Sequence, residues 1–387
     1  MPEWIVLIFV FAFGSCIGSF LNVVIYRLPR DKSLVKPPSS CPACGRHIRF
    51  YDNIPILSWI FLGAKCRYCK APISPRYIII EALTGMIFVA LFVLYFLTDK
   101  PAVQIDGQAG IKAFLNGGWF IYLLHIILLS GLIAASAIDL ELWVIPIFLC
   151  WFVTVVGLAG SVTAPFVIPF VKIAGSFPLP RANPVIAALT AGAFFGLIVS
   201  VILLVTGLIK RSYESRDESA DIDESKASSQ QEQFNHRIEM FREIIFLIPI
   251  IACSIIVYFF ARDAVWWQKF SKFSLVEGFL GSLWGYFVGC AVVWATRIFG
   301  TLVFGREAMG LGDVHLMGAA GAFIGPWAVV LAFFIAPFFG LAWAVFQMFF
   351  KKTRQIPYGP FLSMGIFTVM IFQKFIVDYL NRFTITY

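Results

Sequence analysis

Charged residues are scarce in this chain. Asp, Glu, Lys and Arg make up only 13% of its 387 residues, whereas 60% are hydrophobic. Soluble domains have roughly a quarter of their residues charged. Together with a mean hydropathy of +0.85, this composition excludes an ordinary water-soluble domain and indicates a polytopic membrane protein. The net charge of +8 is therefore interpreted as a signal of membrane topology, not of nucleic-acid binding.

No basic segment precedes the first apolar run. The opening stretch "MPEWIVLIFVFAFGSCIGSFLNVVIYRLPR" lacks the positive region of a cleavable signal peptide. Its apolar part, about twenty residues, is long enough to cross a membrane. Basic residues follow instead, at Arg27, Arg30, Lys32 and Lys36. We therefore expect this span to be retained, with the N-terminus outside and the next loop in the cytoplasm.

Ten apolar stretches are candidate membrane spans. Backbone at membrane depth must satisfy its own hydrogen bonds, so each is expected to be a helix and the fold to be all-α. The eighth is short and rich in glycine, which favours a broken or partly inserted helix. The spans are residues 5–26, 78–97, 119–138, 142–162, 185–209, 244–261, 276–304, 314–326, 327–350 and 363–380.

Basic residues are distributed unequally between the two sides of this layout. The predicted cytoplasmic loops hold twenty Lys and Arg and the predicted outer loops hold seven, as the positive-inside rule requires. One cytoplasmic loop, 210–243, is polar throughout, with nine acidic and six basic residues, and is predicted to be a flexible linker that becomes helical near its end. The cytoplasmic loops are 27–77, 139–141, 210–243, 305–313 and 351–362, and the outer loops are 98–118, 163–184 and 262–275.

The loop 27–77, called the cysteine loop below, contains two CxxC pairs. Cys41 and Cys44 form the first, and Cys66 and Cys69 the second, with 21 residues between the pairs. This spacing is typical of a closed tetrahedral zinc site with four thiolate ligands. A disulfide pair is the weaker interpretation because the cytoplasm is reducing. The alternative is four reduced cysteines without a metal.

Few carboxylates lie in or at the ends of the predicted spans, and such residues are candidates for function. They are Glu81, Asp139, Glu141, Glu277 and Asp313. Four spans separate Asp139 from Asp313, and an even number returns the chain to the same side. Both aspartates are therefore predicted to lie at the cytoplasmic face.

Two carboxylates held close together cannot both ionise cheaply, so one keeps a proton. The ionised one can then deprotonate a water while the protonated one hydrogen-bonds a carbonyl, as in aspartic proteases. Gly310 and Gly312 would let the backbone unwind beside Asp313 and let a substrate strand approach. The alternative is that both aspartates only cap helices at the membrane interface.

Six motifs in order resemble those of one family, the type IV prepilin peptidases or prepilin leader peptidase/N-methyltransferases. The resemblance covers nearly the whole chain. The motifs are "GSFLNVVIYRLP" (18–29), the CxxC pairs around "YDNIPILSWIFLGAKC", "ISPRYIIIEALTG" (73–85), "DLELWVIP" (139–146), "GLGDVH" (310–315) and "IPYGPFLSMG" (356–365).

This resemblance implies a GxGD-type membrane aspartic protease of the bacterial inner membrane. Such enzymes remove the short basic leader of type IV prepilins and pseudopilins at the cytoplasmic face, and many methylate the new N-terminus with S-adenosylmethionine. Asp139 and Asp313 match the catalytic pair, and the four cysteines match the family's zinc-binding loop. Glu81 matches a carboxylate linked to methyl transfer or substrate handling. Residues 1–97 would form the methyltransferase part and 98–387 the protease domain.

The chain departs from the family pattern at three points. His315 stands where lysine is frequent, and Ile147 where a polar residue is frequent. The chain also carries an extra pair of spans and the loop 210–243. If the segment from Asp313 is helical, His315 points away from the aspartate; if it is unwound, His315 can approach the pair and influence its ionisation.

Two other functions remain open. The first is a GxGD protease without methyltransferase activity, and the absence of a GxGxxG fingerprint means that no Rossmann site for S-adenosylmethionine is supported. The second is a non-enzymatic membrane scaffold or transporter that uses the zinc site for a partner. Against a transporter, the chain has no internal repeat, and its carboxylates gather at the cytoplasmic ends of spans, not at the midplane.

Overall fold

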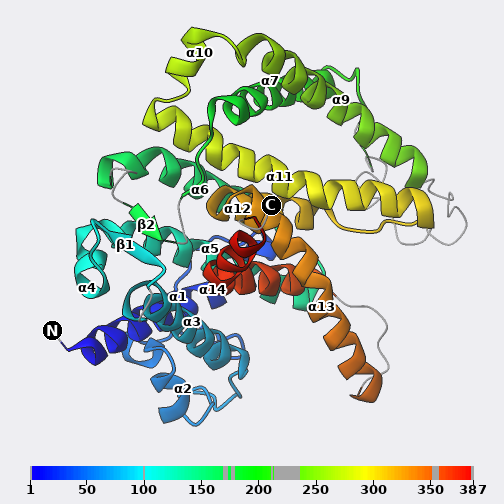
Figure 1. Ribbon diagram of the computed structural model, residues 1–387. Coiled ribbons are helices and arrows are strands. Elements are labelled where there is room, and N and C mark those ends of the chain that lie inside the picture. The colour runs from blue at the N-terminus through cyan, green and yellow to red at the C-terminus, as the bar shows by residue number, and fades with distance from the viewer. Residues whose placement is uncertain are drawn as a thin grey trace, which may run out of the picture. The chain divides into compact units, whose positions relative to one another are not determined.

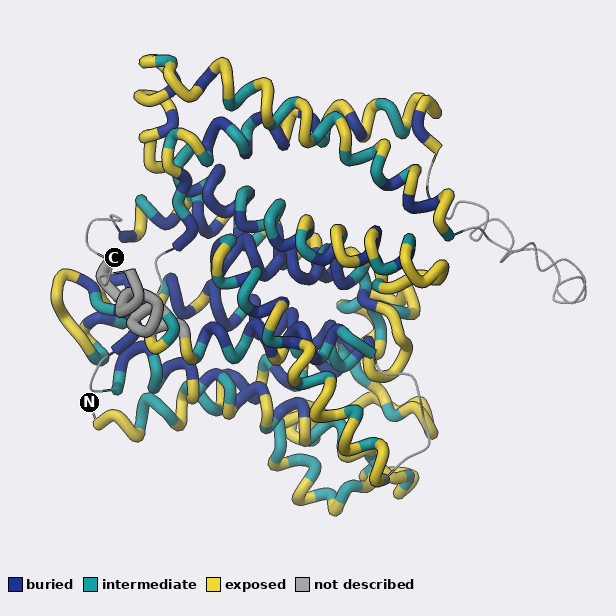
Figure 2. Tube along the Cα trace, turned by 45° about the vertical axis from the view of Figure 1, so that its right-hand side comes forward, coloured by how far each residue is buried: buried dark blue, intermediate teal, exposed yellow. Residues whose placement is uncertain are grey.

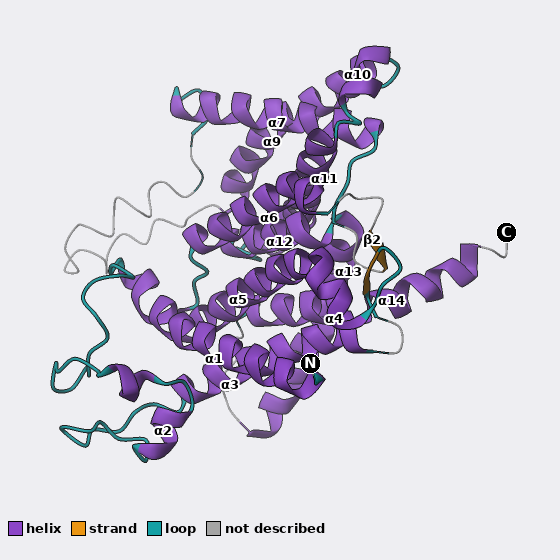
Figure 3. Cartoon of the chain, turned by 90° about the vertical axis from the view of Figure 1, so that its left-hand side faces the viewer, coloured by secondary structure: helices purple, strands orange, loops and turns teal. Residues whose placement is uncertain are grey.

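The computed structural model describes residues 2–98, 101–168, 173–175, 179–210, 212, 236–350 and 357–384. Most of these residues are helical (Figures 1 and 3). Eight of the described helical segments are long and apolar enough to cross a membrane, and two shorter apolar helices accompany them. The predicted all-α polytopic fold with a four-cysteine loop is thus confirmed.

The long helices agree with eight of the ten predicted spans. They are α1 (Glu3–Arg27), α3 (Arg76–Phe92) with its π-helical continuation η3 (Val93–Leu97), α5 (Trp119–Leu142), α6 (Ile147–Val167), α7 (Pro184–Val205), α9 (His236–Ala261), α11 (Ser274–Phe304) and α13 (Pro326–Phe350). The short apolar helix α12 (Leu311–Ile324) is the predicted eighth span. The tenth begins α14 (Gly359–Thr384).

The chain forms two compact units. The first comprises Met1–Leu179 and Leu331–Tyr387, and the second comprises Pro180–Val330. This division concerns packing, whereas the predicted boundary at residue 97 concerns activities and stays a prediction. Most of the polar loop 210–243, from residue 213 to 235, lies outside the described residues.

Helices α1 and α3 of the first unit pack closely because small residues line their contact. A Cβ added to Gly18 would lie 2.7 Å from the Cα of Glu81, and one added to Gly14 would lie 2.9 Å from the Cα of Gly85. Only glycine permits backbones to approach this closely. The Asn22 amide then donates to the Tyr77 carbonyl at 3.2 Å. This packing fixes Glu81 against α1.

Helix α5 forms the buried centre of the first unit, and α14 packs against it. The Ser136 hydroxyl donates to the Ser363 hydroxyl at 2.9 Å, which joins the two helices. At the opposite end, β1 (Val103–Ile105) pairs antiparallel with β2 (Ile173–Gly175). The two loops that contain these strands, both predicted to be outer loops, were not predicted to pair, because segments of three residues carry too little pattern to predict a strand.

The second unit pairs α7 with α9 and α11 with α12, again through glycines. Gly192 and Gly196 of α7 meet the backbone of α9, and Gly285 and Gly289 of α11 meet the backbone of α12. Helix α12 is consequently buried along most of its length. The outward faces of α7 and α9 remain exposed and apolar (Figure 2), as expected for surfaces that meet lipid.

Within the cysteine loop, regular structure is limited to short turns. They are the 3₁₀ turns η1 (Leu28–Arg30) and η2 (Phe50–Asn53) and the helix α2 (Leu57–Phe61). The other elements of the chain are α4 (Gly110–Ala113) with the π-helical η4 (Phe114–Gly118), and α10 (Val265–Phe270).

Candidate functional site

Asp139 lies in the last turn of α5 and is buried. The span was predicted to end at residue 138, but the helix continues to Leu142 and ends at Trp143, which has a left-handed φ of 60°. The backbone N–H of Gly359, the first residue of α14, donates to Asp139 Oδ2 at 3.0 Å. This bond joins residues 220 positions apart and connects the end of α5 to the start of α14.

Gly359 was not predicted as a site residue. A Cβ at this position would lie only 2.7 Å from Asp139 Oδ2 and 2.9 Å from the side chain of Ile145. Any larger residue would therefore push against the carboxylate. The motif "IPYGPFLSMG" contains this glycine, but no local pattern in the sequence shows which distant group it contacts.

Glu141, two residues further along α5, forms an ion pair with Arg76 at the start of α3. This pair connects the helix that carries Asp139 with the helix that carries Glu81. Both side chains are partly exposed, so the pair contributes little to stability.

Asp313 is the third residue of α12 and is buried. The backbone N–H of Gly310, the residue that precedes the helix, donates to Asp313 Oδ2 at 3.3 Å. The expectation that Gly310 and Gly312 leave this stretch unwound is wrong for Gly312, because the helix begins at Leu311. An apolar environment favours helical backbone, whose hydrogen bonds are satisfied internally.

His315 belongs to the same helix. Its Nδ1 lies 3.0 Å from the hydroxyl of Tyr286 on α11. Because residues two apart on a helix face different directions, the helical alternative applies, and His315 packs against α11. The structure therefore gives His315 a neighbour other than Asp313.

Asp139 belongs to the first compact unit and Asp313 to the second. Each is described above within its own unit. Their pairing at one catalytic site stays a prediction. Glu277, the remaining carboxylate of the predicted set, lies in the first turn of α11, where an acidic residue stabilises a helix.

The four cysteines of the cysteine loop form a cluster. Their sulfur atoms all lie within 4.8 Å of one another, and Cys41 Sγ lies 3.8 Å from Cys69 Sγ. The sequence thus correctly predicted that two distant CxxC pairs meet. A cluster of this size can hold one metal ion.

Each CxxC pair is held by the same turn. The N–H of the first cysteine donates to the carbonyl five residues later, from Cys41 to Arg46 and from Cys66 to Ala71, at 2.9 and 2.8 Å. The residue directly after each pair, Gly45 or Lys70, has a left-handed φ. Its N–H donates to the carbonyl of the first cysteine of that pair. Two copies of one turn therefore present four thiols to a common centre.

Backbone donors prepare one of these thiols for ionisation. The N–H groups of Cys69 and Tyr68 stabilise the Cys66 thiolate and lower the pKa of Cys66 to about 6. At Cys69, the N–H of Ala71 lowers the pKa, but partial burial and the neighbouring thiols outweigh it and raise it to about 11. Only a bound cation would let all four sulfurs ionise near neutral pH.

Glu81 is buried in α3, and its carboxylate is held by the cysteine loop. The backbone N–H of Ile56 donates to Glu81 Oε2 at 2.8 Å, and the Ser19 hydroxyl of α1 also hydrogen-bonds this carboxylate. Ile56 has φ 64° and ψ −55°, an unfavourable conformation for a β-branched residue. The loop is thus strained at the residue that binds Glu81.

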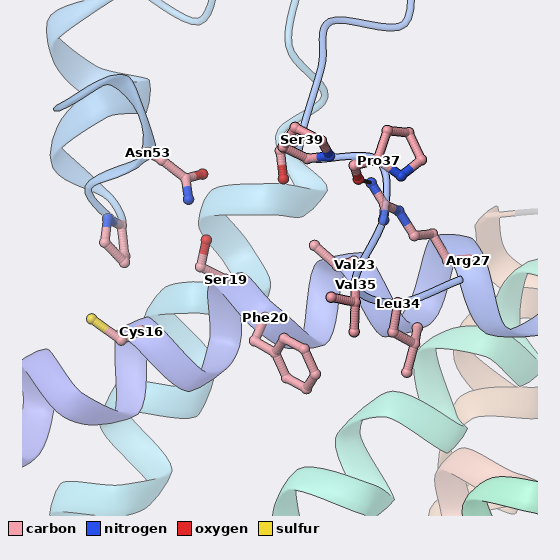
Figure 4. A pocket seen from close by; sticks show the side chains of 12 residues that line it. Cys16, Ser19, Phe20, Val23, Arg27, Leu34, Val35, Pro37, Ser39 and Asn53 are labelled. Atoms are coloured by element: carbon pink, nitrogen blue, oxygen red, sulfur yellow. Dashed lines mark hydrogen bonds between the residues drawn. The ribbon is translucent and has the colours of Figure 1, made fainter. Parts of the chain in front are cut away.

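A cavity of about 350 Å³ lies beside Ser19, between α1 and the cysteine loop. Figure 4 shows Ser19 of α1, with Ser39 and Asn53 of the cysteine loop, around the same space. Arg27 closes one end and donates to the carbonyls of Ser33 and Pro37 at 2.9 and 2.7 Å. The other lining residues are Cys16, Phe20, Val23, Leu34, Val35, Pro37, Pro38 and Pro55.

Comparison with known proteins connects both halves of the chain to one group of enzymes. A profile described as the bacterial peptidase A24 N-terminal domain matches residues 12–95, and one described as the type IV leader peptidase family matches residues 245–345. No solved structure matches.

Among curated proteins, a "Prepilin leader peptidase/N-methyltransferase" of Myxococcus xanthus is 39% identical over 41% of this chain and 40% of that protein. A "Type 4 prepilin-like proteins leader peptide-processing enzyme" of Escherichia coli is 27% identical over 91% of this chain and 88% of that protein. A "Prepilin leader peptidase/N-methyltransferase" of Aeromonas hydrophila is 23% identical over 98% and 96%. With the family's cysteine, aspartate and GxGD motifs all present, the chain belongs to the type IV leader peptidase family.

Proposed function

We propose that this protein cleaves the leader peptide of type IV prepilins or pseudopilins and methylates the N-terminus that cleavage creates. The observation that carries the cleavage role is a pair of buried carboxylates, Asp139 and Asp313, each held by a backbone N–H at a helix start. Both lie in motifs shared with the family, and the rest of the membrane-embedded chain is poor in charge.

In the proposed reaction, the ionised aspartate takes a proton from a water molecule. The water oxygen attacks the carbonyl carbon of the scissile peptide bond, while the protonated aspartate hydrogen-bonds the carbonyl oxygen. The C–N bond of the resulting tetrahedral intermediate then breaks, and the leaving nitrogen takes the proton from the aspartate that deprotonated the water, which gives the new amine and restores the aspartate pair. The gain from such general acid–base catalysis is typically about 10²–10⁴-fold.

The proposed orientation places this chemistry at the cytoplasmic face of the bacterial inner membrane. The excess of Lys and Arg in the loops on that side supports it. The substrate would be a membrane helix preceded by a short basic leader, so cleavage occurs where the leader meets the membrane. Membrane lipid is then the second partner, and no feature calls for nucleic acid.

We propose that the four cysteines bind one Zn²⁺ in a structural site. Four thiols within 4.8 Å of one another match the tetrahedral four-cysteine sites of zinc proteins, which leave no open position for substrate. The metal would thus fold the cysteine loop and take no part in bond cleavage. The loop in turn supplies the Ile56 N–H that holds Glu81.

The cavity beside Ser19 is the site we propose for S-adenosylmethionine. It combines apolar walls at Phe20 and Val23 with polar groups at Ser39 and Asn53, as small-molecule sites commonly do. Bound there, the cofactor would supply a methyl group carried on a positively charged sulfur. The nearby Glu81 carboxylate, with the Ser19 hydroxyl bonded to it, favours a cation in the cavity and can accept the proton that the amine loses.

One experiment tests both activities. The protein is co-expressed with a candidate prepilin, and the mass of the mature N-terminal peptide is measured. Leader removal with an added methyl mass supports both activities, and removal without it leaves the protease-only alternative. Direct binding of S-adenosylmethionine to purified protein, with Asn53→Leu for comparison, tests the cavity independently, and equal affinity in both proteins would contradict that assignment.

A further inference from the structure

A buried arginine lies behind the loop that leads to Asp313. Arg297 of α11 is fully buried and is the largest side chain so buried among the described residues. A guanidinium in such surroundings is costly unless its donors are all paired. An intramembrane charge of this kind is a candidate for function and not only for packing.

One side of the guanidinium is bound to α9. Arg297 Nε and Nη2 donate to the Glu243 carboxylate at 3.2 and 3.1 Å. The indole N–H of Trp294 donates to the same carboxylate at 2.6 Å. Glu243 is itself buried, so this side of the cluster is a fixed anchor.

The other side of the guanidinium holds the loop 305–310 between α11 and α12. Arg297 Nη1 donates to Glu307 Oε1 at 2.7 Å and also to the carbonyl of Met309. Between these two, the N–H of Ala308 donates to the Thr301 hydroxyl at 3.1 Å. Three consecutive loop residues are therefore attached to α11.

The residue after this attached segment is Gly310, whose N–H donates to Asp313. We propose that Arg297 is a positioning residue for Asp313: by holding Glu307 and Met309 it fixes Gly310, the start of α12 and hence the carboxylate. The proposal rests on the cleavage role of Asp313 proposed above. A displacement of about 1 Å in a reacting group can lower a rate about 10²-fold, which gives such an anchor its value.

The chemistry of the cluster requires arginine specifically. A planar guanidinium can donate to two carboxylates and a carbonyl at the same time, in fixed directions. A lysine ammonium carries the same charge but is a point charge without this geometry. A lysine at position 297 would therefore not hold the loop 305–310 in place, although it keeps the charge.

Three conservative variants separate positioning from folding. Thr301→Val removes the bond to Ala308, Glu307→Gln removes the charge from the loop side, and Arg297→Lys keeps the charge without the geometry. Two matched controls make the same changes elsewhere in the second unit. Thr296→Val affects a hydroxyl that bonds only Val292 of its own helix, and Glu239→Gln affects a carboxylate paired with Arg242.

Cleavage of a purified prepilin is measured as kcat and KM, with the melting temperature and the rate of tryptic cleavage after Arg306 as further readouts. We expect kcat to fall about tenfold in Thr301→Val and Glu307→Gln and about a hundredfold in Arg297→Lys, with KM nearly unchanged. Trypsin should cut Thr301→Val faster than Thr296→Val, because the loop is released. Both controls should behave like the parent.

Wild-type kcat in Thr301→Val and Glu307→Gln, while Asp313→Asn is inactive, would overturn the positioning role and leave the proposed function intact. Cleavage by Asp313→Asn would overturn the proposed function itself. A lower melting temperature with unchanged kcat would show that the cluster only stabilises the fold. Thr301→Val and Glu307→Gln keep the test decisive even if Arg297→Lys does not fold.

Discussion

Asp139 and Asp313 share a local arrangement. Each accepts a backbone N–H from the residue at the start of a helix, Gly359 for Asp139 and Gly310 for Asp313. Interface caps would satisfy the same geometry, so hydrogen bonding by itself does not separate catalysis from capping. The distinction lies in what happens when the carboxyl group can no longer exchange a proton.

Asp139→Asn and Asp313→Asn should each abolish detectable cleavage, with a loss of about 10²–10⁴-fold in rate. Asparagine keeps the size and the hydrogen-bond acceptor, so a capping role would survive the change. The measurement is prepilin processing in membranes, with the amount of inserted enzyme determined by blotting. Processing near the parental rate in either variant would mean that the aspartate changed in that variant only caps a helix.

Gly359→Ala should strongly reduce cleavage although it adds only a methyl group. The new Cβ would lie 2.7 Å from Asp139 Oδ2, so the carboxylate or the start of α14 must shift. Gly340→Ala is the matched control, because its Cβ would lie 3.7 Å from Phe361, an ordinary contact. Equal activity of the two variants would mean that Asp139 tolerates displacement and is not a catalytic group.

At the scale of elements, hydropathy predicted the helices well because a membrane span needs a long apolar stretch. The helix ends were less predictable. Helix α5 includes Asp139 because Trp143 can adopt a left-handed end, and α12 includes Gly312 because a buried backbone favours internal hydrogen bonds. Neither of these helix ends can be recognised from the hydropathy of the sequence.

Sequence patterns also could not predict which residues the site residues contact. Gly359 meets Asp139 across 220 positions, and Arg297 meets Glu243 across 54. No periodicity connects such residues. By contrast, the cysteines were predictable because the CxxC spacing itself encodes a shared metal centre.

The paired cysteine turns should bind zinc with an affinity that falls at acidic pH. Because the pKa of Cys66 is lowered to about 6, its thiolate persists at pH values where an ordinary thiol is protonated, and this advantage is lost as pH falls through about 6. Below that point protons compete with metal for every sulfur. Zinc affinity measured by chelator competition between pH 8 and pH 5 should therefore fall over the whole range, and more steeply below about pH 6, where Cys66 is also protonated, than above it.

Cys69, whose pKa is raised to about 11, is protonated at neutral pH without metal. Zinc binding at pH 7.5 should consequently release at least one proton, measurable by calorimetry in buffers of different ionisation enthalpy. Cys41→Ser should lose the metal and loosen the cysteine loop. A purified parent protein without zinc, prepared without chelators, would argue against the metal site.

At the scale of the whole molecule, the proposed catalytic pair takes one aspartate from each compact unit. The chain enters the second unit at Pro180 and returns to the first at Leu331, so each unit can be perturbed separately. Variants of the cysteine loop should impair methylation before cleavage, since the first unit's α1, α3 and cysteine loop hold Glu81 and the cavity.

The polar loop between α7 and α9 lies within the sequence of the second unit. It contains none of the proposed site residues. From residue 210 to residue 235 it holds seven acidic and four basic residues, which form no motif. Replacing residues 214–232 with a short Gly/Ser linker should leave cleavage and methylation intact. The replacement ends well before Glu243, so the anchor of Arg297 is retained. Prepilin processing in membranes, normalised to inserted enzyme, is the measurement. A stable but inactive linker variant would mean that the loop binds the substrate or a partner, and graded restoration of acidic or basic segments would then show which charge is recognised.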